Sequence, residues 1–88
     1  MCNFIKEIKI MEFKILLKTI ENVKNFVRIA SLYKCDITVH SIDRRYILDA
    51  TSLLGIFSLD LTKPLIVNIE DIEYAESFKK DIEKFIIL

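Results

Sequence analysis

The chain has 88 residues, of which 52% are hydrophobic and 30% are charged, and its 13 basic and 13 acidic residues cancel. This length and composition predict one folded domain with a modest core and exclude a disordered chain. The balanced charge argues against a nucleic-acid partner, because binding to a phosphate backbone normally needs a basic surface.

The cysteines and the N-terminus indicate where the protein is located and whether it binds a metal. Cys2 and Cys35 lie far apart without the spacing of metal ligands, so we expect free thiols, no metal site and no cofactor. Residues 1–10 mix charged with apolar side chains and lack the apolar core of a signal peptide. We therefore expect a cytoplasmic protein with no membrane segment, in which residues 1–10 are an extension and residues 11–88 form the domain.

Apolar periodicity divides the domain into strands, with a period of two, and helices, with a period near 3.6. The predicted strands cover residues 12–18, 36–40, 45–50 and 65–69. The predicted helices cover residues 20–34, the stretch 51–61, and the tail from residue 71 onward. This β-α-β-β-α-β-α order predicts an α+β fold, in which an antiparallel sheet carries helices on one face.

The stretch from Thr51 to Leu61 is a short apolar run that contains the only glycine, Gly55. Read as a helix, it begins at Thr51 or Ser52, whose side-chain oxygen would accept a hydrogen bond from a backbone N–H of the first turn. Apolar residues surround this helix almost completely. One face can therefore pack on a core, while the other must meet solvent or a partner.

The sequence from residue 50 to residue 59, Ala-Thr-Ser-Leu-Leu-Gly-Ile-Phe-Ser-Leu, resembles the HPr family, the small phosphocarrier proteins of the bacterial sugar phosphotransferase system. It is similar to the family's pattern of serine, two apolar residues, glycine, two apolar residues, serine and leucine. The segment 29–33 before Asp36 is similar to the end of the family's first helix, and the resemblance covers about residues 11–87. It implies an open-faced β-sandwich of four antiparallel strands with three helices on one face.

In active family members, a histidine at the start of the first helix carries a phosphoryl group, an arginine helps to hold it, and a proline follows. Alignment back from Ala30 places these positions on Thr19, Glu21 and Asn22, so all three residue types are missing here. A threonine phosphate ester holds the group too stably to pass it on, and a glutamate repels phosphate. The resemblance thus implies an HPr-like protein that is not an enzyme and lacks histidine phosphotransfer.

The family's second site does match. A serine at the start of the second helix is phosphorylated by a regulatory kinase in many members, and Ser52 stands at that position. The resemblance implies that the adjacent apolar face docks onto partner proteins through Leu53, Leu54, Phe57 and Leu59. The partners expected are phosphotransferase components or a serine kinase, with no nucleic acid and no membrane. A plain helix cap without regulation is the alternative for Ser52. For Leu53, Leu54 and Phe57, the alternative to a docking surface is packing in the core with a few scattered apolar residues on the surface.

Two other hypotheses remain open at this stage. The chain could be an active phosphocarrier that uses an atypical acceptor, either Thr19 or His40, although the alternation of the second strand predicts that His40 is an ordinary exposed histidine. It could also be an unrelated interaction module of the ferredoxin-like kind, which would have a different strand order.

Overall fold

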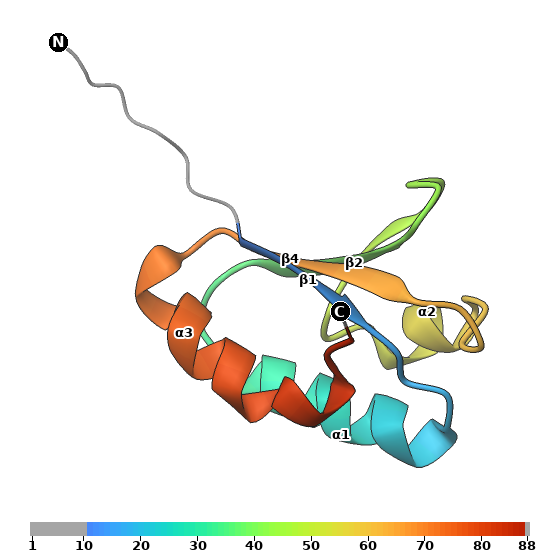
Figure 1. The fold of residues 1–88 in the computed structure, drawn as a ribbon, viewed down its shortest axis with the longest axis horizontal. Coiled ribbons are helices and arrows are strands. Elements are labelled where there is room, and N and C mark those ends of the chain that lie inside the picture. The colour runs from blue at the N-terminus through green and yellow to red at the C-terminus, as the bar shows by residue number, and fades with distance from the viewer. Residues whose placement is uncertain (1–10, 88) are drawn as a thin grey trace, which may run out of the picture.

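The computed structural model describes residues 11–87, which form a four-stranded antiparallel sheet and three α-helices (Figure 1). The strands are β1 (Met11–Ile15), β2 (Ile37–Ser41), β3 (Ile47–Asp49) and β4 (Leu65–Ile69). The helices are α1 (Ile20–Ser31), α2 (Leu53–Phe57) and α3 (Ile72–Asp81), followed by a short 3-10 helix, η2 (Glu83–Phe85). The strand order is β1-β4-β2-β3, and the predicted α+β fold is confirmed. The proposed extension, residues 1–10, lies outside the described residues.

The core lies between one face of the sheet and the helices, as Figure 1 shows for α1 and α3. Strands β1 and β4 alternate as predicted, and their inward residues are buried. The fully buried side chains include Ile15, Val39 and Val67 from the sheet, Val23 and Phe26 from α1, and Ala75 and Phe78 from α3. Phe26 meets Phe78 edge to face, with ring centroids 6.2 Å apart, so aromatic packing joins the two long helices.

Five elements are shorter than the periodicity predicts, namely β1, α1, β3, α2 and α3. Strand β3 covers only Ile47–Asp49 rather than residues 45–50, and α3 ends at Asp81 rather than continuing through the tail. Strand β1 ends at Ile15 rather than at residue 18, because Ile15 pairs with Leu65, the first residue of β4, and the chain then turns at Lys18, whose φ is 65°. Leu17 nevertheless stays buried, so the apolar alternation continues beyond the strand. Helices α1 and α2 end early in hydrogen bonds between residues three apart, such as Leu32 N–H to Ile29 C=O and Ser58 N–H to Gly55 C=O, both 3.0 Å. Such bonds tighten the last turn and stop the helix.

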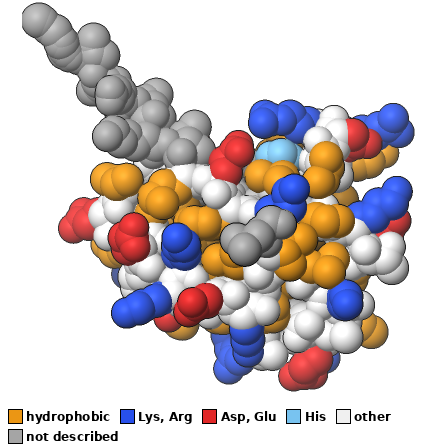
Figure 2. Space-filling model, in the orientation of Figure 1, with side chains coloured by type: hydrophobic (Ala, Val, Ile, Leu, Met, Phe, Trp, Pro, Cys, Tyr) orange, Lys and Arg blue, Asp and Glu red, His pale blue; other side chains and the backbone are white. Residues whose placement is uncertain are grey.

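The hairpin between β2 and β3 folds over the face of the sheet that lies away from α1 and α3 (Figure 1). Arg44, in the turn, reaches across to Glu12 on β1, with 3.7 Å between Nη2 and Oε2. His40 lies on this outer face and is only 2% exposed, so the prediction of an exposed histidine is wrong. Strand alternation places its side chain correctly, but the folded hairpin and the flanking strands cover it. Figure 2 shows the histidine in pale blue, with basic side chains beside it.

Among residues 11–87, no helix combines the length and the apolar character needed to span a bilayer. The same residues contain no cluster of three or more histidine, cysteine or acidic side chains that could hold a metal ion.

Candidate functional site

The start of α1 is held by two side chains. Thr19 occupies the N-cap position in extended backbone conformation, and its Oγ1 accepts a hydrogen bond from the backbone N–H of Asn22, at 3.1 Å. Asn22 in turn donates from Nδ2 to the backbone C=O of Leu17, at 2.6 Å. This is the position to which the sequence resemblance assigns a phosphoryl-carrying histidine. In this chain, the threonine hydroxyl there satisfies a free N–H of the first helical turn.

The charge at this end of α1 is mixed. Glu21 lies exposed in the first turn of α1, where a carboxylate stabilises the helix through its dipole. Lys18, on the other side of Thr19, is also exposed. Because Glu21 stands at the position assigned to the phosphate-holding arginine, its carboxylate would repel a phosphoryl group on Thr19.

The start of α2 differs from the prediction. Ser52 occupies the N-cap position, but its side chain makes no capping hydrogen bond. Thr51 does not cap the helix either, because its hydroxyl donates to Asp49 Oδ1 at 2.7 Å. The expected capping bond from either hydroxyl is therefore wrong. The backbone at Asp49 makes the turn instead, since its C=O accepts from the N–H of Ser52 at 2.9 Å.

The Ser52 hydroxyl packs over Gly55. A Cβ added at Gly55 would lie 2.7 Å from Ser52 Oγ and 3.3 Å from Leu48 Cδ1, which is closer than atoms normally approach. Gly55 therefore allows the half-buried Ser52 side chain to lie against the helix backbone. Gly55, the only glycine of the chain, therefore allows α2 to pack closely against Ser52 and Leu48. The sequence alone does not distinguish this packing role from close approach of a partner protein.

The four apolar residues predicted to bind a partner do not share one environment. Leu53, Phe57 and Leu59 are half-buried and pack against the core, whereas Leu54 is 81% exposed. Helix α2 packs against α1, whose first residue, Ile20, is another apolar side chain with 62% exposure. We call Leu53, Leu54, Phe57 and Leu59 the α2 surface. The sequence analysis did not identify Ile20 as an exposed apolar residue beside α2. Its position directly after the N-cap Thr19 could have indicated this, because it places Ile20 in the first turn of the helix.

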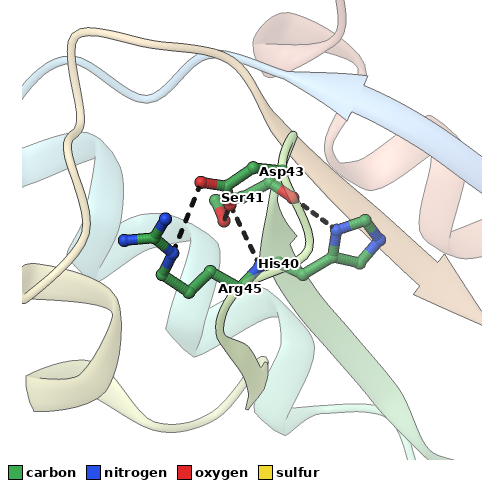
Figure 3. A network of polar contacts seen from close by, with 4 residues as sticks. All are labelled: His40, Ser41, Asp43 and Arg45. Carbon is green, nitrogen blue, oxygen red and sulfur yellow. Dashed lines mark hydrogen bonds and ion pairs between the residues drawn. The ribbon is translucent and has the colours of Figure 1, made fainter.

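His40 is the second residue considered as an acceptor. Its Nδ1 lies 2.6 Å from the backbone C=O of Ser41, and its Nε2 is buried without a hydrogen-bond partner among the described residues. The Ser41 hydroxyl contacts Asp43, which also accepts from the backbone N–H of Arg45 at 3.0 Å (Figure 3). These contacts lower the pKa of Asp43, the bond from Ser41 most strongly. The arrangement orders the hairpin turn and leaves the imidazole enclosed.

Comparison with solved structures identifies a protein with the same fold. The chain is similar to the crystal structure of HPr-C-His from Thermoanaerobacter tengcongensis, with a TM-score of 0.66 and 23% sequence identity. The match covers 86% of this chain and 88% of that one. It confirms the HPr-like fold, and the ferredoxin-like alternative is therefore wrong. No family model matches the chain, and a comparison with curated proteins found no match.

Proposed function

We propose that the chain is an HPr-like protein of the bacterial cytoplasm, related to the phosphocarriers of the sugar phosphotransferase system, that does not relay a phosphoryl group through histidine. It acts instead as a regulatory or adaptor protein that binds other proteins through the α2 surface. One observation carries the proposal. Thr19, at the assigned histidine position, uses its side-chain oxygen to cap α1.

The chemistry at Thr19 supports the loss of the relay. A relay needs a nitrogen nucleophile whose bond to phosphorus is easily transferred, and a threonine hydroxyl forms a stable ester instead. Its Oγ1 is engaged with the N–H of Asn22, and Glu21 adds negative charge in the same turn. The other acceptor, His40, is 2% exposed, whereas a group that exchanges phosphoryl with two partner proteins must be accessible.

The exposure of Leu54 supports a docking role for α2. A leucine that is 81% exposed leaves most of its apolar area available to a partner. The half-buried Leu53 and Phe57 hold this helix on the core and add apolar area beside it. The partners that fit the resemblance are proteins of the phosphotransferase system or a serine kinase.

Ser52 is the residue that such a kinase would modify. Its hydroxyl makes no capping bond, so phosphorylation breaks no hydrogen bond of the described fold. The phosphate charge of about −1.5 to −2 beside Leu53 would change which proteins the α2 surface accepts. Intact mass after incubation with an HPr serine kinase and ATP tests this step. A gain of one phosphate that disappears in Ser52→Ala supports it, and a gain that persists in Ser52→Ala refutes it.

The relay itself is tested with phosphoenolpyruvate and the general phosphotransferase enzyme, with a conventional HPr as the positive control. We expect no acid-labile label on this chain. Acid-labile label would refute the proposal, and its loss in His40→Ala would show that His40 is the acceptor. Acid-stable label that is lost in Thr19→Ala would instead indicate a threonine ester. The double variant Thr19→His, Glu21→Arg is the matched gain-of-function design, because it restores the nucleophile and the phosphate-holding cation.

A further inference from the structure

The two edges of the sheet differ in whether another segment pairs with them. The edge of β1 is partly covered by the end of the chain, where Ile86 pairs with Ile15 and the N–H of Ile87 donates to the C=O of Lys14 at 2.9 Å. Within residues 11–87, no segment pairs with the outer edge of β3. An uncovered edge presents backbone groups that can pair with another strand.

The hydrogen-bond pattern shows which groups of β3 point outward. The N–H of Ala50 donates to the C=O of Ile37 on β2, at 2.9 Å. Antiparallel pairing alternates, so the groups of Leu48 also face β2, and those of Ile47 and Asp49 face away from it. The C=O of Asp49 is already bonded to the N–H of Ser52, at 2.9 Å. The N–H and C=O of Ile47 and the N–H of Asp49 are left for a neighbouring strand.

The side chains along this edge are complementary to their own copy. Residues 45–49 read Arg-Tyr-Ile-Leu-Asp, with an apolar residue at the centre and opposite charges at the ends. Ile47 is 64% exposed, and Asp49 is also exposed. The Arg45 side chain is 71% exposed, although its Nε lies 3.9 Å from Asp43 Oδ2. If two copies pair antiparallel about Ile47, Arg45 of each copy lies opposite Asp49 of the other, and the two Ile47 side chains meet.

From this self-complementary edge we propose that the chain forms a symmetric dimer in which β3 pairs antiparallel with β3 of a second copy. Parallel pairing would place like charges opposite each other and is disfavoured. Arg45 lies two residues before β3, and the antiparallel register extends the pairing to it, so that each Arg45 C=O accepts from the partner copy's Asp49 N–H. The Arg45 N–H, which would face the occupied Asp49 C=O, is already bonded to Asp43 Oδ1 at 3.0 Å. The Arg45 N–H and the Asp49 C=O face each other in this register, and each keeps a hydrogen bond within its own chain.

The dimer joins the two sheets into one sheet of twice the width. On the outer face, Ile66, His40 and Ile47 occupy neighbouring positions on three adjacent strands. Pairing at Ile47 continues this row into the second copy and covers the most exposed member of the row. The contact is a single short edge, smaller than the interfaces of stable dimers. The association is therefore weak and reversible.

Sedimentation equilibrium of the full chain between about 10 µM and about 1 mM tests the proposal, because weak interfaces dissociate in this range. We expect the average mass to rise from that of the monomer toward that of the dimer. Arg45→Asp and Asp49→Arg each place like charges opposite each other, and each should weaken the dimer about tenfold or more. Arg28→Asp, an equal change of charge on α1, should leave the dimer unchanged.

The decisive sample is an equimolar mixture of the Arg45→Asp and Asp49→Arg variants. In the mixed dimer every charge again faces its opposite, so association should return. A wild-type chain that remains monomeric throughout the range would overturn the proposal, as would a mixture that does not associate. Asp49 also bonds Thr51, so its replacement could disturb β3. Ile47→Lys is therefore the independent variant, and a dimer of undiminished strength in Ile47→Lys would refute the pairing.

Discussion

Replacement of Thr19 by alanine removes the hydroxyl that caps α1 and leaves the N–H of Asn22 without its partner. Loss of such a cap typically costs about 1 kcal/mol, within a range of about 0.5–2 kcal/mol. In a domain of this size, 1 kcal/mol corresponds to a decrease of about 4–8 °C in Tm. We therefore expect Thr19→Ala to lower Tm by about this amount in a thermal unfolding experiment followed by circular dichroism.

The matched control is Thr19→Ser, which keeps an oxygen at the capping position and should retain most of the stability. Thr62→Ala is a second control, because the Thr62 hydroxyl is exposed and bonds Asp60 outside any helix. An unchanged Tm in Thr19→Ala would refute the capping role. An equal loss in Thr19→Ser and Thr19→Ala would also contradict it, because the serine oxygen preserves the bond.

Three further predictions concern the rest of the molecule. Leu54→Lys should leave the free energy of unfolding within about 0.5 kcal/mol of the wild type in urea titrations, as should Leu32→Lys, because both leucines are largely exposed. Only Leu54→Lys should weaken binding to a partner protein. His40→Ala should lower the free energy of unfolding by about 2 kcal/mol or more, because it leaves a cavity under the hairpin; an unchanged value would contradict the burial of His40. The Thr51 hydroxyl and backbone N–H lower the pKa of Asp49, so this carboxylate stabilises the fold above its unfolded pKa and loses that effect as the pH falls below about 4. Thr51→Val should therefore show a smaller loss of stability between pH 6 and pH 3, and an unchanged or larger loss would argue against the bond.

Local patterns predicted much of the fold. Strand β4 covers residues 65–69 as expected, because Pro64 marks its start and its apolar alternation is regular. Asp71 likewise begins α3, with its side chain accepting from the N–H of Glu73 at 3.0 Å. The excess length predicted for β1 has a cause that its own periodicity does not reveal, because the partner strand β4 begins at Leu65, opposite Ile15. Leu17 continues the alternation of a strand that has already ended.

Two errors came from contacts that a linear pattern does not contain. His40 alternates as an outward residue, but it lies on a central strand between Ile47 of β3 and Ile66 of β4, which are distant from each other in sequence. At α2, two adjacent hydroxyls were equal candidates for the cap. The bond from Thr51 to Asp49 and the close packing of Ser52 on Gly55 exclude a capping bond from either.

The candidate site was predictable in part. The sequence placed Thr19 at the start of α1 and Ser52 at the start of α2, and both residues occupy the N-cap positions of those helices. It could not separate Leu54, which faces solvent, from Leu53 and Phe57, which pack on the core. That difference depends on how α2 sits against the core, because apolar residues surround the helix almost completely.

The central claim, that proteins dock on the α2 surface, is tested most directly by amide chemical shifts of the ¹⁵N-labelled chain. The labelled chain is titrated with the general phosphotransferase enzyme in the absence of phosphoenolpyruvate, and separately with an HPr serine kinase. With at least one of them, we predict changes centred on Leu53, Leu54, Phe57 and Leu59. The amides of Leu32 and Tyr46, which are also exposed apolar residues, should not respond. Binding that shifts other surfaces and leaves these four residues unchanged, or no shift with either protein, would contradict the account.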